Sequence, residues 1–254
     1  MIRAGLTSVT FRNLKPDEII ELAKATSVTD IEWGGDLHVK DESDAVYVYG
    51  LCKKAGINCC SYGSYYKVGT YNDSYMIQFE KTLKTAIKLN CETIRVWCYN
   101  KPSDDVERYS DEYNEIISEI RNIAKYAAKY KISISFEHHQ KTLTDNHKRA
   151  IELISDVDYS NVFMYWQAQV PLTFEENKQA LTMFKPYLKN LHISNQIQSG
   201  YLLLSEMENQ LLEYVNIVKD KDTVALIEFV KGSDKTAYLQ DIVTLKKVLK
   251  KINE

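Results

Sequence analysis

Residues 132–142 read ISISFEHHQKT, and this stretch shows the unit from which the chain is built. Up to Glu137, apolar and polar side chains alternate, which is the pattern of a β-strand with one buried face. Two isoleucines and a phenylalanine take one face, and two serines and the Glu137 carboxylate take the other. A Thr-Leu-Thr-Asp sequence at 142–145 then predicts the start of a helix. The stretch therefore predicts a strand, a short loop and a helix, with a carboxylate at the C-terminal end of the strand.

Strand-like runs and helical patterns alternate along the rest of the chain in the same way. The predicted strands cover residues 4–10, 30–33, 58–62, 93–97, 132–137, 162–167, 190–194 and 224–229. The predicted helices cover residues 16–25, 44–54, 71–89, 110–130, 144–155, 173–184, 206–218 and 233–251. Start and stop signals support several of these helices: Pro16 opens the first, Ser110 can cap the fourth, and Gly56 follows the second.

Eight strands alternating with eight helices, at about thirty residues per pair, match the size and order of a TIM barrel. We therefore expect an α/β protein, a (β/α)8 TIM barrel, as a single domain over residues 1–254. A doubly wound open sheet is the alternative, because it has the same order of elements. The even spacing favours the barrel, and so does the lack of a G-x-G-x-x-G or G-x-x-x-x-G-K-[ST] loop after the first strand.

Composition limits the partners that the protein can have. The chain has 254 residues and a formal net charge of −3, with Lys and Arg scattered along it, which argues against nucleic acid as a partner. It has no apolar run long enough for a membrane span and no signal-peptide pattern, so we expect no membrane association and a cytoplasmic location. Five cysteines without C-x-x-C spacing favour reduced thiols over a disulfide scaffold or a zinc ribbon. The sequence leaves the oligomeric state open, a homo-oligomer included.

Polar side chains stand at the ends of the last four predicted strands. Glu137 ends the fifth strand and Gln167 the sixth. His192 takes the inward face of the seventh, and Glu228 interrupts an otherwise apolar eighth. The C-terminal ends of the strands meet at the active site of a TIM barrel, and oxygen and imidazole ligands suit Mg²⁺, Mn²⁺, Co²⁺ or Zn²⁺. Because a buried carboxylate is costly unless it is paired or metal-bound, we predict that these residues share one divalent metal ion.

Other residues near the strand ends are candidates for contacts with a substrate. Aromatic side chains commonly form the walls of sugar sites, and polar groups beside them can bind hydroxyls. The candidate substrate contacts are Glu32, His38, Tyr62, Trp97, His139 and Trp166. Arg95 is better interpreted as an ion-pair partner inside the barrel, with Glu32 as its mate.

Several short motifs occur together along the whole chain. They are GLTSVTFR at 5–12, IEWGGDLH at 31–38, IRVW at 94–97, Glu137 with TLT at 142–144, YWQ at 165–167, LH at 191–192 and IEFV at 227–230. As a set they resemble the xylose-isomerase-like TIM-barrel superfamily, and within it the sugar phosphate isomerase/epimerase proteins. The resemblance implies that Glu137, Gln167, His192 and Glu228 hold one divalent metal, and that the two glutamates act as catalytic acid and base.

One position departs from the family pattern, because Gln167 stands where the family has an aspartate. An amide oxygen can coordinate a hard cation, but it removes one negative charge from the ligand set. The substitution therefore lowers the metal affinity that we expect.

The resemblance implies a metal-dependent isomerase or epimerase of a sugar or a sugar phosphate. One glutamate would remove the proton next to the carbonyl and the other would return a proton, while the metal stabilises the enediolate between these steps. Two alternatives stay open: a lyase like inosose dehydratase, and a non-catalytic sugar-binding barrel whose metal site is impaired by Gln167. A DNA-repair endonuclease on this barrel is disfavoured, because it needs several metals and the chain has few histidines and no basic face.

Overall fold

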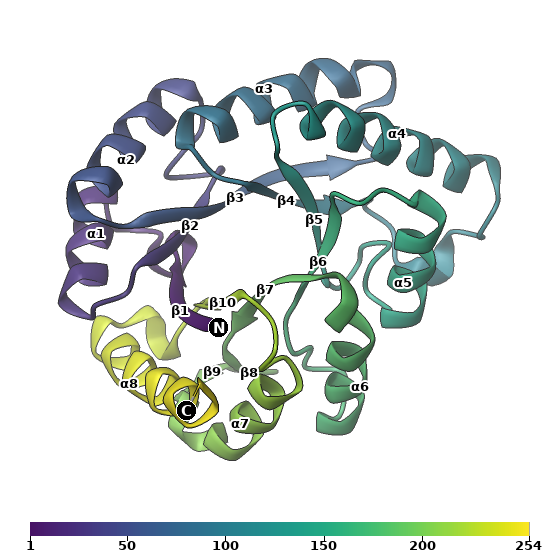
Figure 1. Ribbon diagram of the computed structural model, residues 1–254. Coiled ribbons are helices and arrows are strands. Elements are labelled where there is room, and N and C mark those ends of the chain that lie inside the picture. Colours follow the sequence, from purple (N-terminus) through teal and green to yellow (C-terminus); the bar gives the residue numbers. More distant parts are fainter. Residues whose placement is uncertain (254) are drawn as a thin grey trace.

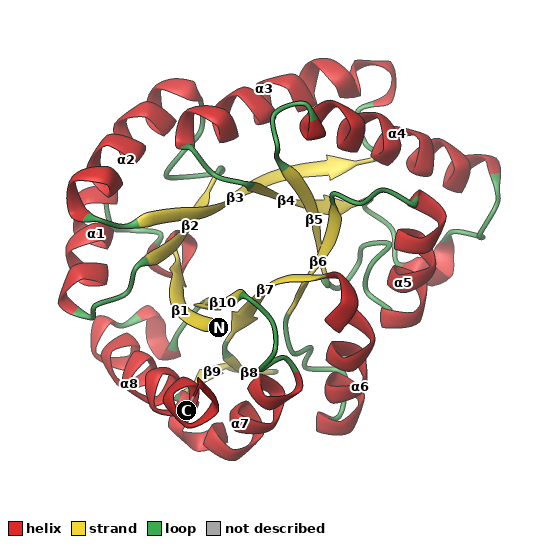
Figure 2. Cartoon of the chain, in the orientation of Figure 1, coloured by secondary structure: helices red, strands yellow, loops and turns green. Residues whose placement is uncertain are grey.

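The computed structural model describes residues 1–253 and shows a closed barrel of eight parallel strands surrounded by eight helices (Figure 1, Figure 2). The barrel strands are β1 (Ile2–Thr7), β2 (Asp30–Gly34), β3 (Asn58–Val68), β4 (Thr93–Cys98), β5 (Ser133–Glu137), β6 (Val162–Trp166), β7 (Leu188–Ile193) and β10 (Thr223–Ile227). They follow the order β1-β10-β7-β6-β5-β4-β3-β2 around the barrel, so neighbours in sequence are also neighbours in space. The prediction of an α/β TIM barrel is confirmed.

The helices form the outer ring, with one helix after each barrel strand (Figure 1). They are α1 (Pro16–Ala25), α2 (Glu42–Ala55), α3 (Tyr75–Leu89), α4 (Asp111–Ala128), α5 (His147–Val157), α6 (Phe174–Phe184), α7 (Glu208–Ile217) and α8 (Lys235–Asn253). The start and stop signals predicted from the sequence are present at several helix ends. Ser110 caps α4 by accepting the Tyr113 backbone N–H, and Gly56 ends α2 with a φ of 69°, a left-handed conformation that glycine adopts without strain.

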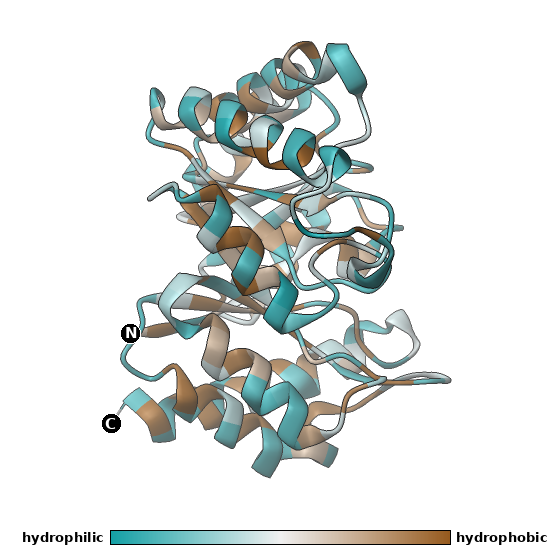
Figure 3. Ribbon diagram, turned by 90° about the vertical axis from the view of Figure 1, so that its right-hand side faces the viewer, coloured by the Kyte–Doolittle hydropathy of each residue, from teal (hydrophilic) through white to brown (hydrophobic). Residues whose placement is uncertain are grey.

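Alternation along the strands divides their side chains between two layers. On β5, Ile134 and Phe136 are fully buried in the apolar layer between strands and helices. Ser133 takes the other face, where its hydroxyl shares a hydrogen bond of 2.8 Å with Thr93 on β4. The helices complete the apolar layer with one stripe and expose polar residues elsewhere, which gives them the mixed colouring of Figure 3. The alternation of apolar and polar residues along the strands therefore places polar side chains inside the barrel.

Two predicted strands differ from the structure by three or more residues at their C-terminal ends, and the others by at most two. The chain leaves β1 at Thr7 and forms a 3-10 helix at Ser8–Phe11, in which the Thr10 hydroxyl donates a hydrogen bond to the Ile227 carbonyl at 3.2 Å. Strand β3 does not stop at Tyr62 but continues to Val68, and its side chains at Tyr66 and Val68 are buried. Sequence alternation is weak in this stretch, because tyrosines occur on both faces.

An antiparallel hairpin that the sequence did not predict follows β7. Its strands are β8 (Asn195–Ile197) and β9 (Gly200–Leu202). Tyr201 of the hairpin packs against Phe229 with a ring-centroid distance of 5.5 Å. The hairpin therefore lies next to the end of β10, beside the residue that follows Glu228.

The two ends of the described chain meet on one side of the barrel (Figure 3). The Asn253 side chain donates to the Ile2 carbonyl at 3.1 Å and accepts the Ile2 N–H at 3.4 Å. Within residues 1–253, each helix is too short or too polar to cross a bilayer.

Candidate active site

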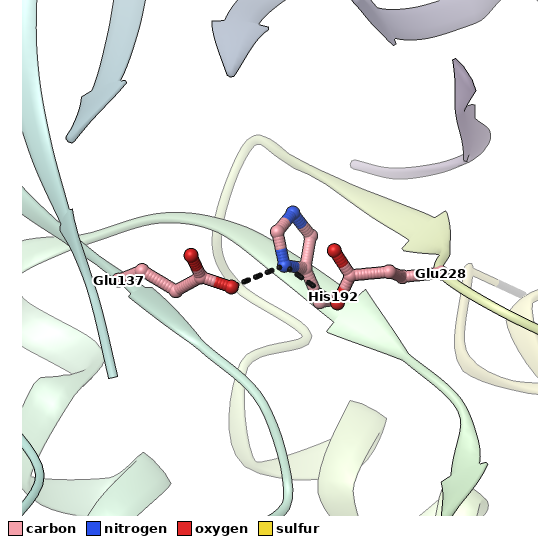
Figure 4. Close-up of side chains that lie close together, drawn as sticks. All are labelled: Glu137, His192 and Glu228. Carbon is pink, nitrogen blue, oxygen red and sulfur yellow. Dashed lines mark ion pairs between the residues drawn. The ribbon is translucent and has the colours of Figure 1, made fainter. Parts of the chain in front are cut away.

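Three side chains converge at the C-terminal ends of the barrel strands (Figure 4). Glu137 is the last residue of β5, His192 lies near the end of β7, and Glu228 directly follows β10. One ligand atom from each residue lies within 4.8 Å of the other two, and all three residues are buried. The structure thus brings together three of the four residues that the sequence assigned to a metal. We call Glu137, His192 and Glu228 the triad.

Backbone contacts fix the two glutamates of the triad. The Glu228 N–H donates to the Ile193 carbonyl of β7 at 3.0 Å, which continues the sheet one residue beyond β10. The Glu137 carbonyl accepts the Thr144 hydroxyl at 2.6 Å, so the loop after β5 folds back on the strand end. Both carboxylates therefore project from backbone that neighbouring elements hold in place.

The imidazole of His192 is the centre of the triad. Its Nδ1 lies 3.3 Å from Glu137 Oε1 and 3.1 Å from Glu228 Oε2. Neither contact has hydrogen-bond geometry, so Nδ1 is a buried nitrogen without a hydrogen-bond partner among the described residues. Donor atoms on one cation at about 2.1 Å lie about 3.0 Å apart in an octahedral shell and about 3.4 Å apart in a tetrahedral one. The measured separations fall between these values, so the triad fits a divalent cation.

Glu32 holds the other side of the same imidazole. Its Oε1 lies 3.2 Å from His192 Nε2, and its Oε2 accepts the Ser61 hydroxyl at 2.7 Å. With one ring proton on Nε2 bonded to this carboxylate, a cation could displace the other proton and bind Nδ1, as in the carboxylate–histidine pairs of many metal sites. Glu32 was predicted as a substrate contact, but the structure surrounds its carboxylate with protein groups.

Arg95 connects Glu32 to the triad from the middle of the barrel. Its Nε lies 2.9 Å from Glu32 Oε1, and its Nη1 lies 2.5 Å from Glu137 Oε2. The predicted ion pair with Glu32 is confirmed, and the second pair with Glu137 was not foreseen. Gly63 on β3 makes room for the guanidinium, because a Cβ at this position would lie 2.6 Å from Arg95 Nη2.

The charges in this cluster determine its protonation. Burial by itself raises the pKa of Glu32, but the charges of Arg95 and His192 outweigh burial and lower that pKa to about 2. Burial likewise opposes ionisation of Glu137, and Arg95 and His192 nevertheless hold its pKa far below the usual value. Burial disfavours the His192 imidazolium, yet the carboxylates of Glu228, Glu32 and Glu137 hold the pKa of His192 well above its usual value. Three carboxylates thus face one guanidinium, and the cluster favours a further positive charge.

Trp97 and His139 form an aromatic wall beside Glu137. The Trp97 indole N–H donates to Glu137 Oε2 at 2.5 Å. The His139 ring lies 5.0 Å from the Trp97 ring with an interplanar angle of 30°. Tyr65 packs its ring edge against Trp97 at 5.3 Å, and the Lys67 ammonium lies over the same ring at 4.9 Å. Trp97 and His139 were predicted from the sequence as substrate contacts. Tyr65 and Lys67 were not, because the predicted third strand ended at Tyr62.

Gln167 lies at the end of β6, as predicted, and one of its contacts is defined. Its amide nitrogen donates to the His138 carbonyl at 3.1 Å, which ties the residue after β6 to the residue after β5. This bond orients the amide, and metal ligation by its oxygen stays a prediction.

Three of the predicted substrate contacts lie away from the triad. Both ring nitrogens of buried His38 contact protein oxygens, the Ser8 hydroxyl at 3.0 Å and the Leu14 carbonyl at 3.1 Å. Tyr62 faces outward and donates its hydroxyl hydrogen to the Val39 carbonyl at 3.0 Å. Trp166 is buried against Tyr214 of α7, with a ring distance of 4.8 Å.

The placement of these three residues corrects the sequence analysis. In a strand, a residue directly before or after an inward-facing residue points to the opposite face. Tyr62 follows Ser61, whose hydroxyl contacts Glu32 inside the barrel, and Trp166 follows Tyr165, whose ring contacts His192. The position of Tyr62 and Trp166 in the alternation of their strands therefore predicts the face they take better than their aromatic character does.

Comparison with known proteins agrees with the fold. Residues 20–202 match the sequence profile of the xylose isomerase-like TIM barrel family. A 3-dehydroshikimate dehydratase of Bacillus anthracis is 22% identical over 227 residues, which cover 82% of this chain and 77% of that protein.

Solved structures share the fold at low sequence identity. The probable 3-DHS dehydratase AsbF of Bacillus anthracis superposes with a TM-score of 0.81 and 18% identity, over 96% of this chain and 98% of that one. An L-ribulose 3-epimerase superposes with a TM-score of 0.72 and 12% identity, over 99% of this chain and 96% of that one. These likenesses show a common barrel that carries both dehydratases and epimerases.

Replacing Arg95 tests whether the guanidinium holds the buried carboxylates. Arg95→Met should lower the free energy of unfolding at pH 7 by about 3 to 5 kcal/mol, because Glu32 and Glu137 lose their buried counter-ion. Because the pKa of Glu32 is about 2 in the folded protein and 4.5 ordinarily, its contribution is present above pH 4.5 and is lost as the pH falls toward 2. Urea titrations across this pH range should show that acid-dependent loss in the wild type and a smaller one in Arg95→Met.

Arg12 provides a matched control for this experiment. Its guanidinium pairs with Asp36 on the surface, where the Arg12 side chain is 51% exposed. Arg12→Met should therefore cost less than about 1 kcal/mol. An equal loss in the two variants would contradict the role given to Arg95.

Proposed function

This chain belongs to the xylose isomerase-like TIM barrel family, and we propose that it is a metal-dependent isomerase or epimerase of a sugar or sugar phosphate. The observation that carries the proposal is the buried His192 Nδ1, which has no hydrogen-bond partner in the described chain and faces two carboxylate oxygens. Such a donor set belongs to a cation site more readily than to a structural hydrogen-bond network.

The proposed ligands are the triad and Gln167. Glu137 would bind through Oε1, since Arg95 and Trp97 already occupy Oε2. The absence of thiolates favours Mg²⁺, Mn²⁺, Co²⁺ or a catalytic Zn²⁺. A divalent cation bound there would act as a Lewis acid on the carbonyl and hydroxyl oxygens of the substrate.

The two glutamates have different surroundings and therefore different roles in proton transfer. Among the ion pairs of the described residues, Glu228 contacts His192 but no arginine or lysine, whereas Glu137 also contacts Arg95, so Glu228 is the better proton acceptor. It would remove the proton from the carbon next to the carbonyl, which gives an enediolate. The protonated Glu228 would then return the proton to the neighbouring carbon, and an epimerase would take the proton for the other face from water. Glu137, whose Oε2 accepts hydrogen bonds from Arg95 and Trp97, would stay ionised and bind the cation through Oε1.

The aromatic wall would orient the substrate for this transfer. Trp97 offers an indole face beside the proposed metal, and His139 packs against that indole. Flat apolar rings bind the C–H face of a sugar while carboxylates and the cation bind its oxygens. Trp97 and His139 are the two members of the predicted substrate set that we retain as contacts.

A dehydratase is the second candidate function. The names of two relatives support it, and it needs the same first step. Glu228 would again remove the proton next to the carbonyl, and the hydroxyl on the next carbon would leave with a proton as water. Glu137 is paired with Arg95 and Glu228 is not, and this difference also suits a dehydratase. A lyase requires only one carboxylate that exchanges protons freely.

Hydrogen exchange tests the proposed proton transfer directly. Protein loaded with Mn²⁺ and incubated with a panel of ketoses and aldoses in deuterated water should introduce deuterium next to the carbonyl of at least one sugar. Glu228→Gln should reduce that exchange by about 10²-fold or more, since it removes the proton acceptor. Mass spectrometry gives the deuterium content, and NMR distinguishes an isomer or epimer from an unsaturated product that has lost water.

The His38→Gln variant is the control, because His38 is held by Ser8 and Leu14 away from the triad. It should exchange at close to the wild-type rate. Failure of the wild type to exchange hydrogen with any sugar or cyclic hydroxy-ketone would contradict catalysis and favour a binding protein.

Gln167→Asp tests the fourth proposed ligand. Adding a carboxylate to the proposed shell should tighten Mn²⁺ binding by about tenfold or more, because the Coulomb attraction to a divalent ion is strong at ligand distance. Titration followed by Mn²⁺ electron paramagnetic resonance measures the change. Unchanged affinity would exclude Gln167 from the ligand set, and Gln169→Asp, two residues farther along, serves as the comparison.

A further inference from the structure

We propose that Lys67 binds an anionic group of the substrate, so that the site selects a carboxylated or phosphorylated sugar-like compound over a neutral one. This inference rests on the proposed function, and it adds a residue that determines specificity at the same barrel mouth.

Strand register places Lys67 in the layer of the triad. Lys67 pairs with Trp97 across β3 and β4, and Val96 pairs with Phe136 across β4 and β5. Trp97 and Glu137 each follow one of these paired residues, so Lys67, Trp97 and Glu137 occupy one level on three adjacent strands. Since neighbouring strands lie about 4.8 Å apart, the backbones of Lys67 and Glu137 are about 10 Å apart.

The alternation of β3 turns Lys67 toward the barrel mouth. Tyr66 before it is buried and donates its hydroxyl hydrogen to Glu119 of α4 at 2.7 Å, on the helix side. Val68 after it is buried in the apolar layer. Lys67 therefore takes the inner face, where its ammonium lies 4.9 Å from the centre of the Trp97 ring. The Trp97 indole N–H in turn donates to Glu137, so the ammonium and the triad share one aromatic wall.

An irregularity in β3 produces this orientation. The pairing of β3 with β4 shifts between Gly63 and Lys67, where four steps along β3 match two steps along β4. Tyr65 within it has a φ of 58°, and the Ser64 hydroxyl stabilises the bulge by donating to the Arg95 carbonyl at 2.8 Å. Bulges of this kind commonly redirect side chains next to active sites, and a positive φ at tyrosine costs free energy. The strain at Tyr65 is consistent with a functional position for Lys67, where the irregularity ends.

The charge of Lys67 lacks the counter-ion that nearby arginines have. Arg95 lies between Glu32 and Glu137, and Arg12 pairs with Asp36. Within residues 1–253, no carboxylate lies within ion-pair distance of the Lys67 ammonium, although the residue is half-buried. A partly desolvated ammonium at the C-terminal ends of the strands attracts an anion, and a carboxylate or phosphate on the substrate would supply it.

The test compares matched ligands that differ in charge. D-glucitol, D-gluconate and D-glucitol 6-phosphate share a polyhydroxy chain, and only the last two are anionic. In calorimetric titrations of Mn²⁺-loaded protein, at least one anion should bind about tenfold tighter than D-glucitol. Lys67→Met should remove that advantage and leave D-glucitol binding within about twofold of the wild type. The two anions distinguish a carboxylate site from a phosphate site.

Lys88→Met is the matched control, since it removes the same charge from an exposed position in the last turn of α3, at the opposite end of the barrel. It should leave all three affinities unchanged, and equal melting temperatures for the two variants would exclude a folding defect. Retention of anion binding by Lys67→Met, or no preference for either anion in the wild type, would overturn the inference.

The outcomes also separate this inference from the proposed function. Mn²⁺ binding with no effect of Lys67→Met on the anions would reject only the role of Lys67. Lack of Mn²⁺ binding with a lysine-dependent anion preference would reject the metal site and support the anion contact. Lys231 lies three residues after Glu228, and Lys231→Met is measured alongside. Loss of anion binding in Lys231→Met but not in Lys67→Met would place the anion beside Glu228 and overturn the assignment to Lys67.

Discussion

The guanidinium of Arg95 lies between the carboxylates of Glu32 and Glu137, and the arrangement of the site depends on this buried contact. Two carboxylates inside a barrel repel each other and lose hydration, so they remain ionised only beside a cation. By binding Oε2 of Glu137, Arg95 turns Oε1 toward His192. By binding Glu32, it holds the carboxylate that contacts the far nitrogen of the same imidazole. One fixed cation therefore orients both a glutamate and a histidine of the triad.

The same charges explain why the mouth of the barrel suits a second, exchangeable cation. Three carboxylates surround one guanidinium and one imidazole, which leaves the cluster short of positive charge. The proposed divalent ion at the triad would balance the charges of the cluster with a neutral amide at Gln167. Lys67 adds a positive charge farther out, beside Trp97.

Much of this architecture could be predicted from the sequence, and the failures have clear physical causes. The barrel fold could be predicted from the strand–loop–helix pattern that residues 132–142 show and the chain repeats, because period-two alternation and helix signals are local properties of the sequence. Polar residues in apolar strands are conspicuous in a sequence. For this reason the triad could be named from the sequence as candidate site residues, and Arg95 could also be paired with Glu32. Trp166 and Tyr62 were misplaced because aromatic character suggested a sugar wall while alternation turned them outward. Lys67 and Tyr65 were missed because a bulge in β3 is set by tertiary pairing with β4, which has no local signal.

The central claim is that Glu137, His192 and Glu228 hold one divalent cation. Crystals of the protein grown with Mn²⁺ and measured on both sides of the manganese absorption edge test it most directly. We predict a single anomalous peak bonded to Glu137 Oε1, His192 Nδ1 and Glu228 Oε2, with Arg95 still on Oε2 of Glu137. A triad without an anomalous peak at saturating Mn²⁺, or a peak bound elsewhere in the barrel, would contradict it.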